Sequence, residues 1–402
     1  MTASPKLFGM ALVLGLLSAI GPFAIDMYLP ALPAIGASLQ ADIGAVQLSL
    51  TVFFIAIGAG QLLYGPVSDM LGRKLPLYFG LALFALASVG CALASDVQTL
   101  IALRFVQGLG AAAGMAIPRA IVRDLHTGTV AARLMSLLML VFSISPILAP
   151  LAGSLAIAVS GWRSVFWAVA LAAVAGMVLM ATSLRETRPP AERVRASLGS
   201  AFRAYAALLR DRHYLGLVLT GAFAMAGFFT YLANSSFVMI DHYGLSPTMY
   251  SVAFGVNAAA FFAASQLNGT LGERFGLASV AKGGVAACGT VMCAMLLYFL
   301  GGGDRLSVLI VLYFIATACM GLVIPTTAVL ALEEHGANAG TASALMGTLQ
   351  MLIGALVMAL VGLFTDGTPL PMVAGMAGGA LVAVVLAWGT LREGRAEQAV
   401  GG

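Results

Sequence analysis

Two charged side chains, Asp26 and Arg104, fall inside long apolar runs of the sequence. Charge is costly in hydrocarbon, so an ionisable group in such a run is a candidate functional group by default. The carboxylate of Asp26 can take up and release a proton as its surroundings change. Arginine keeps its proton, so Arg104 would act as a fixed cation that pairs with Asp26 or with backbone carbonyls. The two residues predict a proton-coupling site.

Each residue also has a simpler interpretation. Asp26 precedes Pro30 and Pro33, so it could be a capping or interfacial acid. Arg104 could extend its head group to the outer membrane surface. Gln107, one turn after Arg104, adds polar character to the same helix face and favours the functional interpretation. The first apolar run holds no second acid, so it offers no carboxylate dyad.

Membrane-spanning helices are the elements that must position these residues. Hydrophobic residues make up 61% and charged residues 9% of the 402 positions, which argues against a soluble enzyme because such a fold would leave large apolar patches in water. Runs of about 20 residues, enough to cross about 30 Å of hydrocarbon, recur along the chain. We place them at residues 8–30, 45–66, 75–94, 98–121, 134–158 and 162–183, and at 214–239, 248–270, 277–300, 306–332, 340–364 and 370–391.

These spans form two sets of six. They predict an all-α membrane protein with twelve transmembrane helices in two pseudo-symmetric six-helix bundles, over residues 1–184 and 214–402. The polar stretch 185–213 is too short to bury a core and is predicted to be a cytoplasmic linker. Segments 65–72 and 269–276 both carry glycine, acid and glycine at equal spacing, the internal symmetry of transporters with a central site.

The basic residues indicate the orientation. About 17 of the 20 Lys and Arg residues fall in the N-terminal segment, the linker, the C-terminal tail and alternate loops, and basic loops stay in the cytoplasm. We therefore expect a multi-pass protein of the bacterial inner membrane with both termini cytoplasmic. The cations form no single stripe, which argues against a nucleic-acid partner. The four cysteines lack the spacing of a metal site, so we expect no metal and no cofactor, with protons as the coupling ion.

The stretch GQLLYGPVSDMLGRK, after the second span, is dense in turn-forming and charged residues. Gly65 and Gly72 permit tight turns and close helix approach. Asp69 can cap a helix N-terminus, and Arg73 and Lys74 can hold the loop at the inner surface. This combination predicts a gate that latches one conformation, and the alternative is an ordinary positive-inside turn.

Other polar and helix-breaking residues complete the predicted machinery. Pro146, Pro150 and Gly153 predict a kinked fifth span that pivots against a neighbour. The substrate cavity is predicted to be lined by Asp26 and by the uncharged polar residues within spans, Tyr28, Gln107, Asn234, Asn257 and Gln350.

These motifs resemble the major facilitator superfamily over nearly the whole chain. GQLLYGPVSDMLGRK resembles its signature between spans two and three, and LRFVQGLG at 103–110 resembles its span-four motif, whose arginine is associated with proton coupling. Residues 145–153 resemble its antiporter motif, although Ala149 and Ala152 replace expected glycines. DMYLPALP at 26–33 and GTASAL at 340–345 resemble the bicyclomycin and chloramphenicol resistance exporters, the Bcr/CflA group.

The resemblance implies drug:proton antiport. We therefore expect a monomeric, non-enzymatic multidrug efflux antiporter that exports small amphipathic antibiotics of the bicyclomycin or chloramphenicol kind by alternating access. Its partners would be drugs, protons and membrane lipid. The alternative within the same fold is a proton-coupled uptake symporter for a small metabolite. A receptor or scaffold that transports nothing would leave Asp26 and Arg104 without a role.

Overall fold

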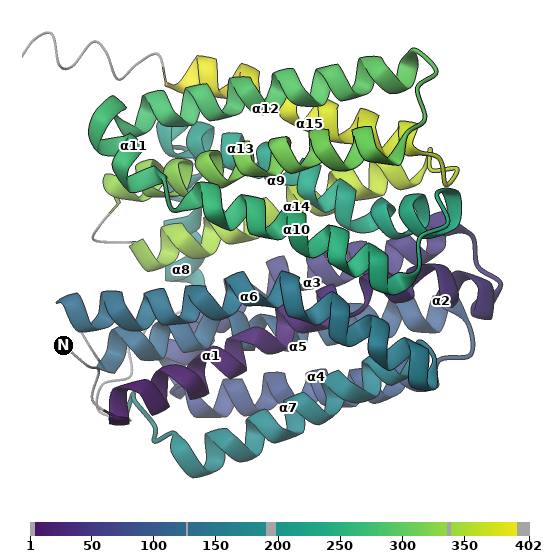
Figure 1. Cartoon of the computed structure of the whole chain (residues 1–402). Helices are drawn as coiled ribbons and strands as arrows, with labels where there is room; N and C mark the ends of the chain where they lie inside the picture. Colours follow the sequence, from purple (N-terminus) through teal and green to yellow (C-terminus); the bar gives the residue numbers. More distant parts are fainter. Residues whose placement is uncertain (1–4, 126–127, 190–197, 336–338, 392–402) are drawn as a thin grey trace, which may run out of the picture. The chain divides into compact units, whose positions relative to one another are not determined.

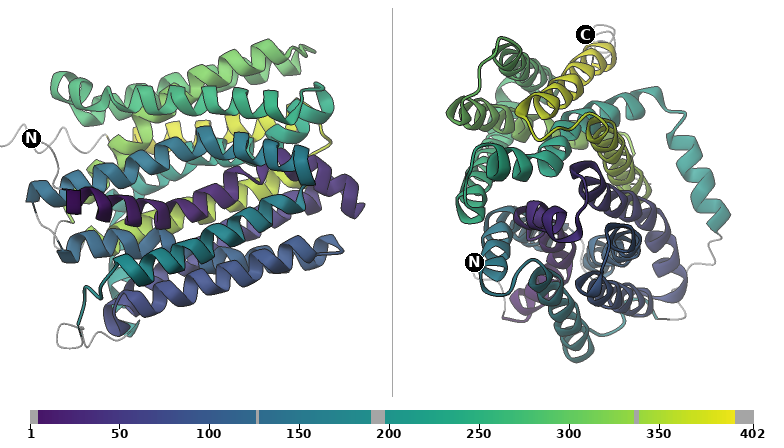
Figure 2. Two further views of the ribbon diagram at one scale, coloured as in Figure 1. Left: turned by 60° about the horizontal axis from the view of Figure 1, so that its bottom comes forward. Right: turned by 90° about the vertical axis from the view of Figure 1, so that its right-hand side faces the viewer.

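The computed structural model describes residues 5–125, 128–189, 198–335 and 339–391. Within these ranges the regular structure is helical and contains no strand (Figure 1), which confirms the all-α fold class. The chain divides into two compact units, Met1–Phe202 with Ser246–Gly255 and Arg203–Leu245 with Val256–Gly402. Within each unit the helices run roughly parallel or antiparallel, as the right-hand view of Figure 2 shows almost end-on.

The helices of each unit follow one another along the chain. The first unit holds α1 (Pro5–Asp26), η1 (Leu29–Ala31), α2 (Leu32–Leu39), α3 (Ile43–Leu71), α4 (Lys74–Leu93), α5 (Val97–Leu125), α6 (Gly128–Ser160) and α7 (Arg163–Ser183). The second unit holds α9 (Arg212–Ser236), η3 (Phe237–His242), α11 (Asn268–Phe275), α12 (Leu277–Leu300), α13 (Leu306–Glu333), α14 (Ala339–Gly362) and α15 (Pro369–Thr390). The division falls inside α8 (Leu198–Leu208) and α10 (Pro247–Ser265), so the first turns of α10 belong to the first unit.

The predicted spans all correspond to helices. Eleven helical segments of the described chain are long and apolar enough to cross a membrane. The remaining predicted span, 134–158, lies within α6, a helix of 33 residues. In the second unit α9 packs against α13, α14 and α15 and so forms the centre of that bundle.

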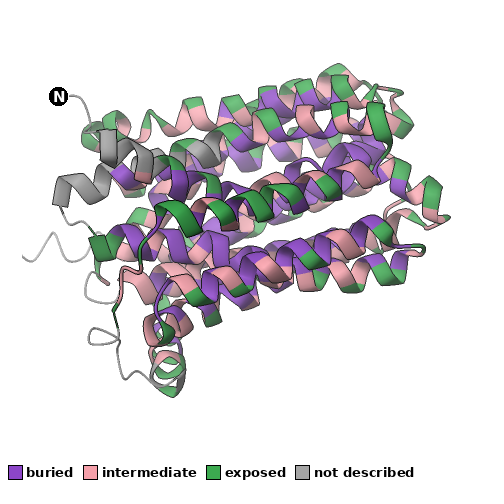
Figure 3. Ribbon diagram, turned by 90° about the horizontal axis from the view of Figure 1, so that it is seen from below, coloured by how far each residue is buried: buried purple, intermediate pink, exposed green. Residues whose placement is uncertain are grey.

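Exposed apolar residues follow one side of α4. Leu75, Phe79, Leu86 and Leu93 are each more than 60% exposed, and their spacing of four and seven residues places them on one helix face. Figure 3 shows exposed positions recurring along the outer sides of the helices, with buried positions on the inner sides. A continuous apolar stripe of this kind is unfavourable in water and suits contact with lipid.

Small residues bring α3, α4 and α5 together. α5 packs along both α3 and α4, which have few contacts with each other. A Cβ atom added at Gly110 of α5 would lie 2.6 Å from the carbonyl oxygen of Gly80 and from the amide nitrogen of Phe84, both on α4. A Cβ at Gly108 would lie 2.5 Å from the carbonyl oxygen of Phe53 on α3. Backbone contact of this kind is how small residues stabilise helix pairs in membranes.

Gly110→Val is expected to destabilise the first unit by about 1–3 kcal/mol or more, since this is the usual cost of overpacking. The atoms it would meet are backbone atoms of α4, which cannot rotate away. Thermal unfolding of the purified protein measures the effect. Gly378→Ala is the control, because a Cβ there meets nothing within 4 Å. Equal unfolding temperatures for Gly110→Val and wild type would contradict the prediction.

Candidate functional site

Arg104 is fully buried in the first unit, where α5 directs it toward two aromatic rings. Its Cζ atom lies 4.4 Å from the ring centre of Tyr28 and 4.0 Å from the ring centre of Phe53. A guanidinium over an aromatic face is attracted by the ring quadrupole, more strongly when water is excluded. The two rings therefore hold the cation in the interior of the bundle, which contradicts the alternative of an arginine extended to the membrane surface.

A chain of hydrogen bonds links Arg104 to α4. Its Nη1 donates to Oε1 of Gln107 at 2.6 Å, and Nε2 of Gln107 donates to Oγ of Ser88 at 2.7 Å. Ser88 in turn donates to the carbonyl oxygen of Phe84 at 2.6 Å. The Nε and Nη2 atoms of Arg104 are buried and have no hydrogen-bond partner in the described chain. Buried donors of this kind are costly, so the guanidinium retains capacity for a further acceptor.

Asp26 is the last residue of α1 and is 5% exposed. Ser145 of α6 donates a hydrogen bond to its Oδ2 at 3.2 Å. Tyr28, two residues later, shares a hydrogen bond of 2.7 Å with Ser49 of α3. The structure thus brings Arg104, Tyr28 and Gln107 into contact, and Asp26 lies two residues before Tyr28 with Ser145 as its partner.

The expected direct pairing of Arg104 is not present in this structure. None of the ion pairs in the described chain joins it to Asp26, and its hydrogen-bond acceptor is Gln107 rather than a backbone carbonyl. The guanidinium instead contacts the Tyr28 and Phe53 rings, and Ser145 of α6 is the hydrogen-bond partner of Asp26.

The antiporter-motif helix α6 contacts the Asp26 segment directly. Besides the bond from Ser145, Gly153 packs so closely on Met27 that an added Cβ would lie 2.9 Å from the Cα of Met27. The carbonyl oxygen of Pro150 accepts a hydrogen bond of 2.9 Å from Ser251 at the start of α10. α6 is assigned as one helix through Pro146 and Pro150.

The predicted cavity residues of the second unit have separate surroundings. Asn257 is 2% exposed and donates to the hydroxyl of Tyr231 at 3.2 Å. The Tyr231 ring stacks on that of Tyr313, with ring centres 3.9 Å apart. Asn234 donates to the carbonyl oxygen of Thr230 and accepts from Thr365. Gln350 of α14 lies beside Gly221 of α9.

The stretch GQLLYGPVSDMLGRK forms the end of α3, a short turn and the start of α4. Gly72 ends α3 with a φ of 89°, a conformation that suits glycine. Arg73 is 3% exposed. Its Nε and Nη2 donate to the two carboxylate oxygens of Asp124 at 2.7 and 3.0 Å, and its Nη1 lies 2.8 Å from Oδ1 of Asp69. Arg188 forms a further ion pair with Asp69.

Two details of this stretch were predicted wrongly. Asp69 lies in the last turn of α3 and caps no helix N-terminus, because the free backbone groups at that end are carbonyls. Glu186 performs the capping instead: its carboxylate accepts from the amides of Arg73 at 2.8 Å and Lys74 at 3.1 Å, at the start of α4. Gly65 lies inside α3, and a Cβ there would meet nothing within 4 Å, so it provides neither a turn nor a close helix contact.

Asp124, Glu186 and Arg188 join Asp69 and Arg73 in what we call the Arg73 cluster. No gating role was predicted for the first three residues from the sequence. Asp124 follows Arg123, and Glu186 and Arg188 lie in a mixed-charge stretch after the sixth span, where charges are ordinary loop residues. Lys74, at the edge of the cluster, donates from Nζ to the carbonyl oxygen of Leu184 at 2.7 Å.

The capping bonds change the acidity of Glu186. Burial alone would raise the pKa of Glu186, but the amides of Arg73, Arg188 and Lys74 hold this pKa below its ordinary value. A carboxyl group with a lowered folded-state pKa stabilises the fold above its unfolded-state pKa. That contribution is lost as the pH falls through the folded-state pKa.

Glu186→Gln is therefore expected to lower the unfolding temperature at neutral pH, since the amide carries no charge and has one acceptor oxygen. The difference from wild type should shrink as the pH falls below the usual glutamate range. A pH series of thermal unfolding measures it, with Glu333→Gln, at the exposed end of α13, as control. A difference that does not change with pH would contradict the capping role.

Comparison with known proteins identifies the family. A model described as the Major Facilitator Superfamily matches residues 14–359. The chain belongs to the major facilitator superfamily. As a member of this superfamily it is a membrane transporter, and the predicted family and fold are confirmed.

The similarity to individual relatives extends over nearly the whole length of this facilitator. It is 37% identical over 386 residues to the "Uncharacterized MFS-type transporter YdgK" of Bacillus subtilis, across 96% of each chain. It is 30% identical over 406 residues to the "Bicyclomycin resistance protein homolog" of Haemophilus influenzae, across 96% of this chain and 97% of that protein. The crystal structure of a D-xylose-proton symporter matches with a TM-score of 0.75 and 16% identity, over 95% of this chain and 97% of that one, which shows the shared fold.

Proposed function

We propose that this facilitator is a proton-coupled multidrug exporter that acts by alternating access. It would act as a monomer in the bacterial inner membrane, with both termini cytoplasmic, and export small amphipathic antibiotics. The observation that carries the proposal is the buried carboxyl group of Asp26, held by Ser145 of α6, in the same unit as a buried guanidinium with two unpartnered donors. Similarity to a bicyclomycin resistance protein homolog supports drugs as the cargo.

The proton changes which donors Asp26 needs. A protonated Asp26 is neutral, and a weak bond such as that from Ser145 satisfies it. Loss of the proton creates a charge that needs strong donors in a dry interior, and the free Nε and Nη2 of Arg104 are the matching groups. Movement of Asp26 toward Arg104 would release Ser145 and free α6 to shift.

This exchange couples the proton to the direction of drug movement. Protonation of Asp26 from the periplasm would accompany drug release to the outside and favour return to the inward-facing state. Proton loss to the cytoplasm would accompany drug loading. Tyr28 and Gln107 are proposed to contact the drug from the first unit, and Asn234, Asn257 and Gln350 from the second. The buried rings of Tyr231 and Tyr313 add aromatic surface beside Asn257.

The Arg73 cluster is proposed to latch one conformation from the cytoplasmic side. Its bonds connect the junction of α3 and α4 to the end of α5 and to the segment after α7. A conformational change that separates these segments must break a bidentate arginine–carboxylate pair, which is among the stronger charged contacts.

A resistance assay tests the proposed function. Expression in a pump-deficient strain should raise resistance to bicyclomycin or chloramphenicol, and an uncoupler that collapses the proton gradient should increase intracellular drug accumulation in expressing cells. The matched control is the Asp26→Asn variant expressed at the same level. Growth that depends on an external metabolite, without any resistance, would support proton-coupled uptake instead. If expression produces neither drug resistance nor metabolite-dependent growth across a broad substrate panel, both the export proposal and the uptake alternative are overturned.

A further inference from the structure

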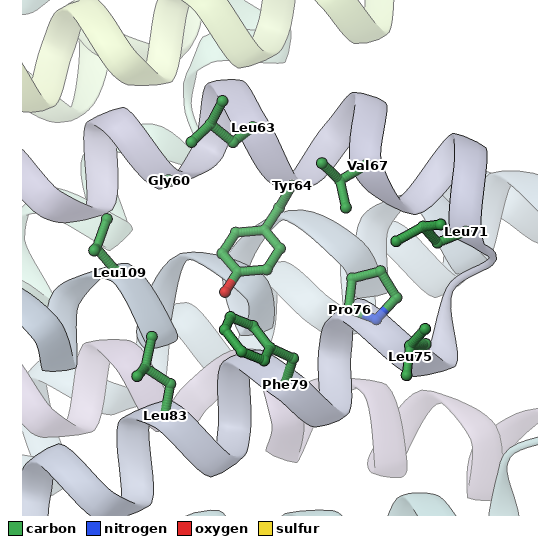
Figure 4. A pocket seen from close by; sticks show the side chains of 10 residues that line it. All are labelled: Gly60, Leu63, Tyr64, Val67, Leu71, Leu75, Pro76, Phe79, Leu83 and Leu109. Carbon is green, nitrogen blue, oxygen red and sulfur yellow. The ribbon is translucent and has the colours of Figure 1, made fainter. Parts of the chain in front are cut away.

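A pocket of about 550 Å³ lies between α3 and α4 of the first unit, with α5 at its base (Figure 4). α3 contributes Leu63, Tyr64 and Leu71, α4 contributes Phe79 and Leu83, and α5 contributes Leu109. It forms because α3 and α4 both pack on α5 and have few contacts with each other. None of its lining residues belongs to the Asp26–Arg104 region, so the pocket is a separate feature of the unit.

The Tyr64 hydroxyl is the polar side-chain group of this otherwise apolar wall. Figure 4 shows the ring crossing from α3 toward Phe79 and Leu83, with the hydroxyl pointing into the pocket. Tyr64 is 9% exposed and forms no hydrogen bond with the described part of the chain. A hydroxyl that faces hydrocarbon without a partner is unfavourable, so an acceptor supplied by a ligand would form a bond that the protein does not provide.

The pocket is accessible from hydrocarbon rather than from water. Its α4 wall includes Leu75 and Phe79, which are 62% and 63% exposed and belong to the apolar stripe along that helix. Its volume is within the range of small-molecule sites, which are mostly apolar with a few placed polar groups. A ligand would therefore enter from the lipid phase and be largely apolar.

The size of the pocket and the Tyr64 hydroxyl together define the ligand more closely. A volume of about 550 Å³ between three helices suits a compact molecule. The methylenes of a lipid chain offer no acceptor to Tyr64. A compact molecule with a carbonyl inside its apolar body would fill the apolar wall and place an acceptor at the hydroxyl.

We propose that this pocket binds lipophilic small molecules that carry one internal hydrogen-bond acceptor, such as a ketone, and that Tyr64 donates the bond. The site is distinct from the proposed transport pathway and does not depend on the direction or cargo of transport.

Fluorescence quenching in nanodiscs tests the proposal. Phe79→Trp places a fluorophore in the pocket wall, and the same protein without this substitution gives the background from its three native tryptophans. The probes are 4-bromobenzophenone, which has a ketone, and 4-bromodiphenylmethane, which has a similar shape and no acceptor. Saturable quenching by the ketone is expected at about fivefold lower concentration than by the hydrocarbon, the value of one typical net hydrogen bond.

Removing the hydroxyl provides the decisive comparison. Tyr64→Phe in the Phe79→Trp protein should remove the preference for the ketone, whereas Tyr78→Phe, on α4 and outside the pocket lining, should keep it. Leu63→Phe, which retains Tyr64 and fills the pocket, should abolish saturable quenching. Equal quenching by both probes in the tyrosine-containing protein would mean that bilayer lipid alone fills the groove and would overturn the proposal. A ketone preference that persists in Tyr64→Phe would overturn it as well.

Discussion

Asp26→Asn is expected to abolish drug-driven proton movement and to leave the protein inserted and folded. Asparagine keeps the size of the side chain and an acceptor for Ser145, whose bond to Asp26 is 3.2 Å, but it cannot take up or release a proton. Proteoliposomes with an internal pH indicator measure the effect: addition of drug should change the internal pH for wild type and leave it at the level of empty liposomes for the variant.

Two control variants separate proton coupling from structural damage. Asp26→Glu retains a titratable group and should retain part of the coupling. Asp42→Asn changes an exposed acid that caps α3 by accepting from the amide of Ala45, and asparagine caps a helix about as well as aspartate. Normal drug-driven pH changes in Asp26→Asn liposomes would rule out Asp26 as the proton carrier.

Arg104→Met is expected to abolish transport without lowering the unfolding temperature. A buried charge costs several kcal/mol in lost hydration, and here two of its donors have no partner. Its contacts with the Tyr28 and Phe53 rings return about 2 kcal/mol, the value of a desolvated cation–π contact. An apolar side chain of similar length removes both the cost and the gain, but it leaves Oε1 of Gln107 without its donor, at a cost of about 1–3 kcal/mol. The folded state should therefore be about as stable as wild type. Thermal unfolding and drug transport on the same preparation measure the two effects.

Removing the Phe53 ring, which contacts the guanidinium of Arg104, should instead lower stability. Phe53 is fully buried, and Phe53→Ala should cost about 3–5 kcal/mol, as expected for a large cavity in a packed interior. If Arg104→Met lowers the unfolding temperature as much as Phe53→Ala, then Arg104 is a structural residue. Arg104→Lys should also lose transport, because an ammonium group cannot reproduce the planar donor arrangement.

The sequence was sufficient to predict the helices and to single out Asp26 and Arg104 as charged groups within them. Apolar runs of membrane-spanning length are a local property, and so is the presence of Asp26 or Arg104 inside one. The partners of these groups are not local. Ser145 lies 119 residues from Asp26 along the chain, and nothing in the SPILAPLAG segment indicates which carboxyl group its serine contacts.

The errors at the α3–α4 junction have the same origin. Asp69 was expected to cap a helix because it is the nearby acid, whereas the cap comes from Glu186, 113 residues after Arg73. A helix start can be capped by any carboxylate that tertiary folding brings near it. Gly65 was expected to mediate a close contact, but only a neighbouring helix can create one, and α5 approaches the backbones of α3 and α4 at its own Gly108 and Gly110 instead.

The packing of α3 and α4 on α5 also has a consequence for biosynthesis. The ribosome delivers α3 and α4 to the membrane before α5, yet the surface on which both of them pack belongs to α5. Until α5 is inserted, the backbone around Gly80 and Phe53 lacks the α5 residues on which it packs, so the two earlier helices cannot complete their native packing. A chain truncated between α4 and α5 should therefore be recognised by membrane quality-control proteases as incomplete, whereas one truncated just after α5 would already contain the first finished three-helix assembly.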